Sequence, residues 1–298
     1  MSSTPAPIVL LTDFGLADWY VAELKGVLLV LAPGAALVDF SHEVPPGDVV
    51  RAAFLLARGH GAFPAGAVFV VVVDPGVGTE RRPLAVAAAG RFYVAPDNGV
   101  LEAALAVPGV RVRRIDDPHL LAVASRTFHG RDVFAPVAAR LALRGEAAFA
   151  DVGSLVKDAV RLVGAIGGAG AGTGAGTEPG AGAGAGAWAT ARTDRLMARV
   201  LHVDRFGNAI TDLTEAQLRV WLAGRESEGV IVTVRGVREA VIRGLALTYG
   251  ASPEPVAVVG SSGLVEIALP GGHAGLALGL GPGTRIELHY EDPFPGDA

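Results

Sequence analysis

Apolar residues in the first half of the chain alternate between short continuous runs and longer stretches with helical spacing. The continuous runs predict strands at residues 8–11, 36–40, 68–73, 84–89 and 92–95. The helical spacing predicts helices at residues 18–31, with Asp18 as the N-cap, and at residues 47–58, 98–106 and 133–144. Strands that alternate with helices indicate an N-terminal α/β domain, with a mostly parallel central sheet covered on both faces.

The second half has a different pattern. Short β-like runs at residues 199–203, 229–234, 256–259, 264–268 and 285–290 are separated by Gly, Pro and Asp, and only residues 215–222 look helical. This pattern predicts a smaller, mostly β domain that is barrel-like. Between the halves, residues 164–187 are mostly Gly and Ala and cannot bury enough apolar area to offset their ordering entropy. We therefore predict domains at residues 1–163 and 188–298, joined by a linker at residues 164–187.

Composition narrows the possible functions. The chain has 298 residues and a formal net charge of −5 without a basic cluster, which argues against a nucleic-acid surface. No apolar run reaches the roughly 18 residues of a membrane span, and the first residues lack a signal-peptide pattern. The absence of cysteine excludes disulfides, thiolate metal sites and a cysteine nucleophile. We expect a cytoplasmic protein with no nucleic-acid or membrane partner.

The stretch VVVVDPGVGTERRP, residues 70–83, is the most informative part of the chain. Four valines predict a buried strand, and Asp74 follows directly at its carboxyl end, ahead of a glycine-rich turn. Asp13 ends the first predicted strand in the same way. Because open α/β sheets bind ligands at the carboxyl ends of their strands, both carboxylates are candidate site residues. An Asp after a strand also serves as a simple turn or cap residue.

Further polar residues fall in loops at comparable places. The segment TFHGRD, residues 127–132, brings His129 ahead of a predicted helix, and DRFGN (204–208) and GSSG (260–263) are tight loops between predicted strands. A lone loop histidine is more often a surface residue, and Asn next to Gly is usually turn chemistry. Taken singly, none of these segments identifies a function.

Together the motifs identify a family. The segments LLTDFG, KGV, VVVDPGVGTERRP, YVAPDNGVL, TFHGRD, DRFGN and GSSGLVEIA occur in order over nearly the whole chain except the Gly/Ala segment. This set resembles the S-adenosylmethionine hydroxide adenosyltransferases, relatives of the bacterial fluorinase and chlorinase. The resemblance implies hydrolysis of S-adenosylmethionine to adenosine and methionine.

The resemblance also implies roles for individual residues. The water-positioning triad of the family falls on Asp74, Arg81 and His129, whereas Arg82 receives no role by its register. The Asp13 position holds the ribose hydroxyls, and a carboxylate is a natural partner for two hydroxyls. The remaining implied substrate-binding residues of the N-terminal domain are Asp18, Tyr20 and Phe128.

In the C-terminal domain, the resemblance implies that Asn208 contacts the adenine edge and that Tyr249 stacks on the base. Asp204 and Ser261 match positions that contact the amino and carboxylate groups of methionine. The halogenases carry an arginine where this chain has Ser262, so recognition of the carboxylate differs here. Ser262 is nevertheless included among the predicted substrate-binding residues.

The implied chemistry suits these residue types. Carbon C5′ of a sulfonium substrate is already activated, and methionine leaves as a neutral thioether that needs no proton. The enzyme must therefore mainly orient a water in line and take its proton. Both Asp74 and His129 are reasonable proton acceptors, and the sequence leaves the choice between them open. No metal or other cofactor is expected.

Three alternatives remain. A chlorinase-like halogenase is the nearest, but Asp74 and His129 stand where the halogenases have tyrosines that shape a dry halide pocket. A divalent-metal hydrolase would use Asp13, His42, Asp74 and His129 as ligands. The third alternative is a sensor that binds the nucleoside without turnover. The resemblance further implies a homotrimer with each substrate site between two subunits.

Overall fold

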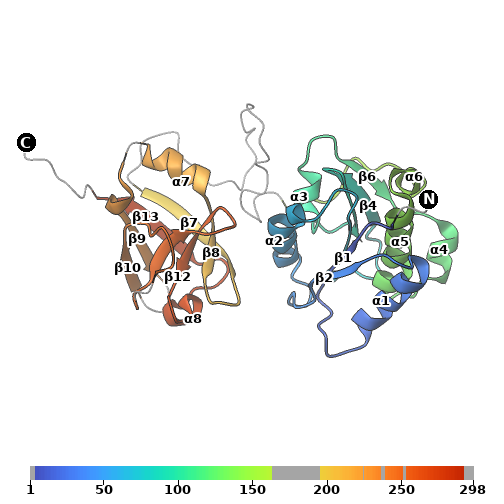
Figure 1. The fold of residues 1–298 in the computed structure, drawn as a ribbon, viewed down its shortest axis with the longest axis horizontal. Helices are drawn as coiled ribbons and strands as arrows, with labels where there is room; N and C mark the ends of the chain where they lie inside the picture. The colour runs from blue at the N-terminus through green and yellow to red at the C-terminus, as the bar shows by residue number, and fades with distance from the viewer. Residues whose placement is uncertain (1–3, 163–194, 224, 236–238, 251–252, 292–298) are drawn as a thin grey trace, which may run out of the picture. The chain divides into compact units, whose positions relative to one another are not determined.

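The computed structural model describes residues 4–162, 195–223, 225–235, 239–250 and 253–291. The chain divides into two compact units, residues 1–165 and 166–298 (Figure 1). The predicted linker at residues 164–187 lies outside the described residues. Each unit is described by itself below.

The N-terminal unit is built on a six-stranded sheet with the order β2-β1-β3-β5-β4-β6. Its strands are β1 (Ile8–Thr12), β2 (Leu37–Ser41), β3 (Val68–Val72), β4 (Pro83–Ala88), β5 (Arg91–Pro96) and β6 (Arg111–Arg114). The pairs from β2 to β5 are parallel, whereas β4 runs antiparallel to β5 and to β6. This arrangement confirms the predicted α/β class with a mostly parallel sheet, although β6 was not predicted.

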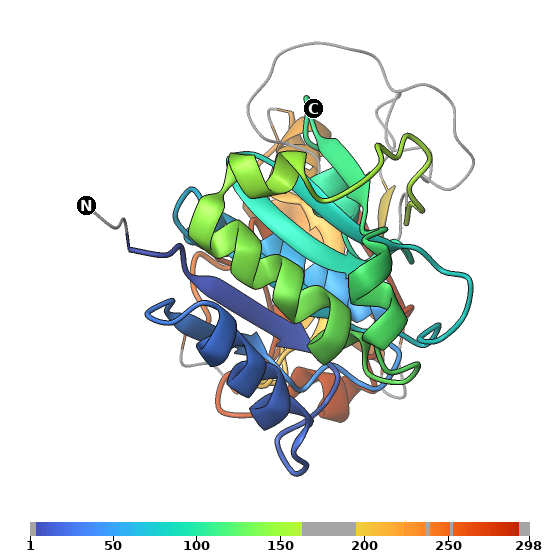
Figure 2. The same ribbon diagram turned by 90° about the vertical axis from the view of Figure 1, so that its right-hand side faces the viewer.

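Helices cover both faces of this sheet. They are α1 (Tyr20–Leu31), α2 (Val49–Gly59), η1 (His60–Ala62), α3 (Glu102–Leu105), α4 (Pro118–Val123), the π-helical turn η2 (Gly130–Phe134), α5 (Ala135–Arg144) and α6 (Glu146–Ala150). Helices α1 and α5 lie on one face of the sheet and α2 and α3 on the other (Figures 1 and 2). Their buried residues belong to two separate cores. Strands β1 and β3 are buried along their whole length, because both faces of the sheet carry a core.

Two predicted helix boundaries were wrong. Helix α1 begins at Tyr20 with Trp19 as its N-cap, so Asp18 does not cap it, and Trp19 already has helical backbone angles. The predicted helix over residues 98–106 is reduced to α3 because Gly99 has a φ of +90°, which a right-handed helix does not allow. The Asn98 side chain donates a hydrogen bond to the carbonyl of Val73 and accepts one from the N–H of Val100, so it holds a turn ahead of α3.

The C-terminal unit is a seven-stranded antiparallel sheet with the order β10-β9-β13-β7-β8-β12-β11. Its elements are β7 (Arg195–Val203), β8 (Ala209–Thr214), α7 (Glu215–Leu222), η3 (Ser227–Gly229), β9 (Val230–Arg235), β10 (Glu239–Arg243), β11 (Val256–Val259), β12 (Leu264–Ala268), α8 (Ala274–Leu278) and β13 (Arg285–Tyr290). The end strands β10 and β11 contact each other, so the sheet is nearly closed around one core. The predicted barrel-like domain is confirmed, although β8 and β10 were not predicted.

Candidate active site

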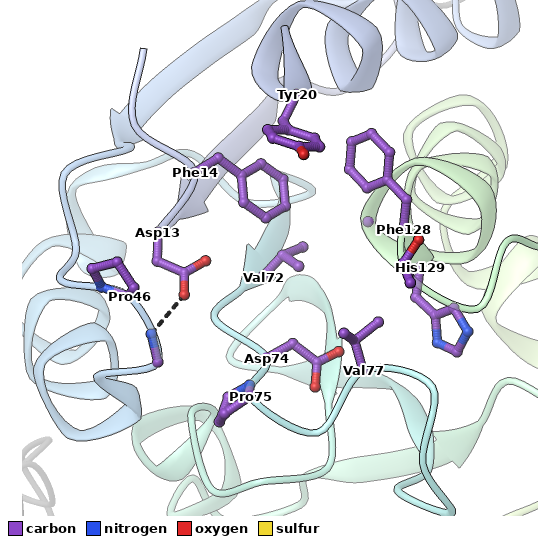
Figure 3. Close-up of a pocket in the computed structure, with 13 residues that line it drawn as sticks. Asp13, Phe14, Tyr20, Pro46, Val72, Asp74, Pro75, Val77, Phe128 and His129 are labelled. Atoms are coloured by element: carbon purple, nitrogen blue, oxygen red, sulfur yellow. Dashed lines mark hydrogen bonds between the residues drawn. The ribbon is translucent and has the colours of Figure 1, made fainter. Parts of the chain in front are cut away.

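A cavity of about 520 Å³ opens at the carboxyl ends of β1 and β3. Thr12 and Val72 are parallel neighbours at the ends of these strands. Asp13, which follows Thr12, and Asp74, two residues after Val72, therefore emerge at the same edge of the sheet. Figure 3 shows both carboxylates together with three aromatic rings around this space. The lining residues are Asp13, Phe14, Tyr20, Pro46, Gly47, Val72, Asp74, Pro75, Val77, Thr127, Phe128, His129 and Gly130.

The residues of the predicted triad form one bonded group. Arg81 donates two hydrogen bonds to Asp74, from Nε to Oδ1 at 3.0 Å and from Nη2 to Oδ2 at 2.5 Å. Its Nη2 also lies 2.7 Å from Nδ1 of His129. The side chains of Arg81 and Asp74 are only 9% and 5% exposed, so little water competes for this pair. Asp74 and His129 line the cavity, whereas Arg81 is not among its lining residues and bridges the two.

This bridge fixes the protonation of His129. A guanidinium only donates hydrogen bonds, so Nδ1 of His129 must accept from Arg81 and cannot carry a proton itself. Burial and the positive charge of Arg81 both lower the pKa of His129 below its ordinary value. The imidazole is therefore neutral at pH 7, with its proton on Nε2.

Asp13 is held by the chain that follows β2. The backbone N–H of Gly47 donates to its Oδ2 at 2.8 Å, the bond drawn in Figure 3. Burial raises the pKa of Asp13, and the negative charge of Asp74 raises it further, although the Gly47 bond opposes the shift. Two carboxylates thus share one cavity, with the charge of Asp74 balanced by Arg81 and that of Asp13 balanced by a backbone dipole.

Aromatic side chains form the opposite wall of the cavity. The rings of Phe14, Tyr20 and Phe128 lie with centroids 5.4–6.1 Å apart, and Phe128 meets the other two edge-on. Tyr20 and Phe128 were predicted as substrate-binding residues, and both line the cavity. Asp18 was predicted there too, but it is exposed and not among the lining residues. Phe14 was missed, although it follows Asp13 directly in the LLTDFG segment.

In the C-terminal unit, Asp204 organises its own loop. Its Oδ1 accepts from the backbone N–H groups of Phe206 and Asn208 at 2.9 and 2.8 Å, and its Oδ2 accepts from the Asn208 side chain at 3.1 Å. Asp204 therefore acts as a turn residue, the alternative that the sequence also allowed. It does not exhaust the carboxylate, which has about four acceptor positions.

Glu266, which the sequence reasoning missed, lies at the centre of the other predicted residues of this unit. The hydroxyl of Tyr249 donates to its Oε2 at 2.9 Å, and the charge of Asp204 is near enough to raise the pKa of both groups. Burial is the larger cause in each case, and it brings the pKa of Tyr249 to about 12. The sequence feature that could have identified Glu266 is an acidic residue inside the apolar strand LVEIA. In the structure this residue is 4% exposed, and buried acids are rare unless they are paired.

The GSSG loop passes beside the same carboxyl group. A Cβ on Gly260 would lie 1.8 Å from Oε1 of Glu266, so a side chain at this position would displace the carboxyl group. Ser261 and Ser262 follow in the turn between β11 and β12, and Ser261 is exposed. The structure thus gathers Asp204, Asn208, Tyr249 and the serine loop at one end of this unit, around Glu266.

Of the four ligands of the metal-hydrolase alternative, Asp13, Asp74 and His129 line the cavity, but His42 is not among the lining residues. His42 is buried, and its two ring nitrogens contact Oγ1 of Thr12 at 2.7 Å and Oδ1 of Asp39 at 3.1 Å. Within the part of the chain that the structure describes, no three His, Cys, Asp or Glu residues lie close enough to hold a metal ion. The absence of any cofactor stays a prediction.

Fold and site together define a class: a two-unit protein whose N-terminal α/β sheet carries a ligand cavity with two acids and a neutral histidine. The family comparison is more specific, because residues 8–153 match the SAM hydroxide adenosyltransferase N-terminal domain and residues 198–287 match the C-terminal domain. The chain belongs to this family.

Individual relatives agree with that assignment. The chain is 41% identical over 294 residues to the (R)-S-adenosyl-L-methionine hydrolase of Thermus thermophilus, covering 95% of this chain and 99% of the relative. It is 40% identical to the hydrolase of the same name from Salinispora tropica, covering 97% and 99%. Among solved structures, an uncharacterized conserved protein from Thermotoga maritima matches with a TM-score of 0.77 and 31% identity, over 95% of this chain and 99% of that one.

The halogenating relatives are more distant. A fluorinase of an Actinoplanes species is 28% identical over 160 residues, which cover 45% of this chain and 54% of the relative. Among the described residues, no helix is long and apolar enough to cross a membrane. The cytoplasmic location and the homotrimer stay predictions.

Proposed function

We propose that this protein hydrolyses (R)-S-adenosyl-L-methionine to adenosine and methionine. The observation that carries the proposal is the group of Asp74, Arg81 and His129 beside the cavity, in a chain that belongs to the SAM hydroxide adenosyltransferase family. The R configuration at sulfur comes from the names of the two hydrolases that are about 40% identical over nearly the whole chain.

The reaction that we propose is an in-line displacement by water. The water oxygen forms a bond to C5′ of the ribose while the bond from C5′ to sulfur breaks, and its electron pair passes to sulfur. Methionine then leaves as a neutral thioether, so no general acid is required. The attacking water becomes strongly acidic as the new bond forms, and its proton must pass to a nearby acceptor.

We assign that acceptor role to Asp74. His129 is neutral with its proton on Nε2, so it donates a hydrogen bond to the water and orients it rather than taking its proton. A carboxylate is a weak base, but the water that is bonding to C5′ becomes acidic enough to protonate one. Arg81 holds both partners at fixed positions, which is the entropic part of the catalysis.

Asp13 is proposed to bind the ribose hydroxyls, and the rings of Phe14, Tyr20 and Phe128 to exclude bulk water from C5′. Partial burial of Asp13 strengthens its hydrogen bonds to a ligand, because fewer water molecules compete for them. In the C-terminal unit, Asn208 and Tyr249 are proposed to contact adenine, and Asp204, Ser261 and Ser262 to contact the methionine portion. Asp18 is left out of this set because it does not line the cavity.

A labelling experiment tests the proposal. The enzyme is incubated with purified R and S diastereomers of S-adenosylmethionine in ¹⁸O-labelled water, and the products are analysed by mass spectrometry. Adenosine that carries one ¹⁸O on its 5′ oxygen, formed from the R diastereomer, is the expected result. Release of adenine, or intact substrate after saturating incubation, would contradict it and would favour another reaction or the sensor alternative.

Chloride competition addresses the halogenase alternative. With excess chloride present, the carboxylate of Asp74 repels the anion, and adenosine should remain the product. A dominant 5′-chloro-5′-deoxyadenosine peak would overturn the assignment to hydrolysis.

We further propose a homotrimer in which each substrate site combines one N-terminal unit with the C-terminal unit of a neighbouring subunit. Exposed apolar side chains of the α1 segment support an association surface, and they are Leu16, Trp19, Leu29 and Val30. Asp74→Ala and Asn208→Ala proteins are mixed at a substrate concentration at which neither is active alone, and activity should be restored through hybrid sites. No recovery after demonstrated subunit exchange would count against shared sites.

A further inference from the structure

The loop that carries Asp74 and Arg81 is anchored at both ends by two consecutive residues. This loop, residues 73–82, connects β3 to β4, and its middle from Gly78 to Glu80 is exposed. The two anchoring residues, Asp97 and Asn98, come directly after β5, the strand that lies between β3 and β4 in the sheet. One strand end therefore reaches both ends of the loop.

The first anchor acts at the start of the loop. Nδ2 of Asn98 donates to the backbone carbonyl of Val73 at 2.9 Å, and its Oδ1 accepts from the N–H of Val100 at 3.1 Å. Val73 is fully buried and directly precedes Asp74. The Asn98 side chain thereby fixes the peptide from which the Asp74 carboxylate projects.

The second anchor acts at the end of the loop. Nε of Arg82 donates to Oδ2 of Asp97 at 2.7 Å, and the backbone N–H of Asp97 donates to the carbonyl of Arg82 at 2.8 Å. The Asp97 side chain is 3% exposed and that of Arg82 is 27% exposed, so a buried carboxylate is joined to a partly exposed arginine through both side chain and backbone. Arg82 directly follows Arg81, so this pair fixes the backbone position from which Arg81 reaches Asp74 and His129.

A segment near the end of the unit completes this arrangement. Nη1 of Arg82 donates to Oδ1 of Asp158 at 2.8 Å, and the N–H of Val160 donates to the other oxygen of Asp97 at 2.8 Å. Asp158 is 81% exposed, so its ion pair adds little. The buried part of the network is the contact of Asp97 with Arg82 and Val160.

We propose that Arg82, Asp97 and Asn98 are positioning residues for the reaction, which hold Asp74 and Arg81 at the spacing that the attacking water requires. This inference rests on the proposed function. It gives a role to Arg82, to which the family register assigned none. A displacement of about 1 Å at a reacting group costs roughly 10²-fold in rate. Release of either anchor is therefore expected to act mainly on kcat.

The same segment offers a matched control. Arg161 forms a bidentate pair with the buried Glu102, at 2.9 and 2.6 Å, and the N–H of Leu162 also donates to Glu102. Within residues 4–162, none of these bonds reaches the loop at residues 73–82. Arg161→Ala therefore loosens the same segment and leaves a buried carboxylate unpaired, as Arg82→Ala does, without touching the catalytic loop.

The experiment compares Arg82→Ala, Asn98→Ala and Arg161→Ala with the wild type, each at a temperature well below its melting point. We expect Arg82→Ala and Asn98→Ala to lower kcat by about 10- to 100-fold with little change in KM, and Arg161→Ala to keep wild-type kcat. Arg82→Lys keeps the charge toward Asp97 and should recover part of the loss.

A second readout does not depend on the reaction. Nitrogen-15 chemical shifts of the His129 ring report whether Nδ1 still accepts from Arg81, and Arg82→Ala should shift them toward a mixture of tautomers while Arg161→Ala should not. Wild-type shifts and kcat in Arg82→Ala and Asn98→Ala would overturn the positioning role, as would equal losses in Arg161→Ala. If the wild type releases no adenosine but the shifts still respond as expected, the proposed function fails and the positioning role stands.

Discussion

The N-terminal and C-terminal units hold their polar site residues in different ways. In the N-terminal unit, Asp74, Arg81 and His129 bond to one another at the end of buried strands, and the first two are nearly inaccessible to solvent. In the C-terminal unit, Asp204 bonds mainly within its own turn, and Tyr249 is 43% exposed although its hydroxyl is anchored on Glu266. A rigid, charge-balanced group suits a chemical step, whereas anchored but accessible side chains suit recognition of a ligand.

This difference predicts that substitutions in the bonded group of Asp74, Arg81 and His129 act on kcat, whereas substitutions in the C-terminal unit act on KM. The largest effect is expected for Asp74→Asn, which keeps the shape of the side chain and removes the proposed proton acceptor. Turnover should fall by about 10²- to 10⁴-fold, the scale of general-base loss. Adenosine release measured by chromatography checks this, with Asp151→Asn, at an exposed carboxylate that pairs with Arg144, as the control. A turnover within tenfold of wild type would remove Asp74 from the proton transfer.

Asp13→Asn is expected to have the next largest effect, and it tests whether the N-terminal cavity also recognises the ribose. Loss of charge-assisted hydrogen bonds costs about 1.5–3 kcal/mol, so KM should rise by roughly 10- to 100-fold while kcat changes little. Steady-state kinetics with adenosine and 2′-deoxyadenosine as inhibitors give the measurement. If the variant still prefers adenosine to 2′-deoxyadenosine as strongly as the wild type does, Asp13 does not contact the 2′-hydroxyl.

A smaller effect is expected at the Tyr249–Glu266 pair of the C-terminal unit. Tyr249→Phe and Glu266→Leu each remove one hydrogen bond that is worth about 0.5–1.5 kcal/mol, so each should raise KM by about 2- to 10-fold. The double variant should show no larger rise than either single variant, because the two side chains act as one unit. Glu266→Gln keeps an acceptor for the hydroxyl and serves as the control. Additive effects would indicate that Glu266 contributes separately from Tyr249.

The smallest effect is a pH dependence that arises from His129. Its pKa in the folded protein is lowered by burial and by Arg81, so it stays neutral until the pH falls below the ordinary value of about 6.5. Between the folded and unfolded pKa values the unfolded chain binds the additional proton, so the free energy of unfolding from this group falls as the pH decreases. Nitrogen-15 NMR titration of His129 should give a pKa below 6.5, and kcat should decrease only at lower pH. A pKa at or above 6.5 would contradict the lowering of the His129 pKa by burial and by Arg81.

Much of the fold and part of the site could be predicted from the sequence because the signals are local. The valine run fixes β3 as a buried strand, and the carboxyl-end rule for parallel strands then brings Asp13 and Asp74 to one edge. The start of α1 could not be predicted. Asp18 is a residue type that favours the N-cap, but in the structure Trp19 holds that position and the helix begins at Tyr20. The contacts of Glu266 and Arg82 could not be predicted because both depend on partners distant in sequence, Tyr249 and Asp97.

By itself, the sequence determined the two-unit organisation, the class of each unit and the motif set that leads to Asp74, Arg81 and His129. These features depend on hydrophobic periodicity and on residue order, both of which are written in the chain. Only the tertiary structure decided that Arg81, which does not line the cavity, bridges Asp74 and His129. This bridge places the proton of His129 on Nε2. A hydrogen bond between residues 48 positions apart depends on how β3, its following loop and η2 pack together, and no local pattern carries that information.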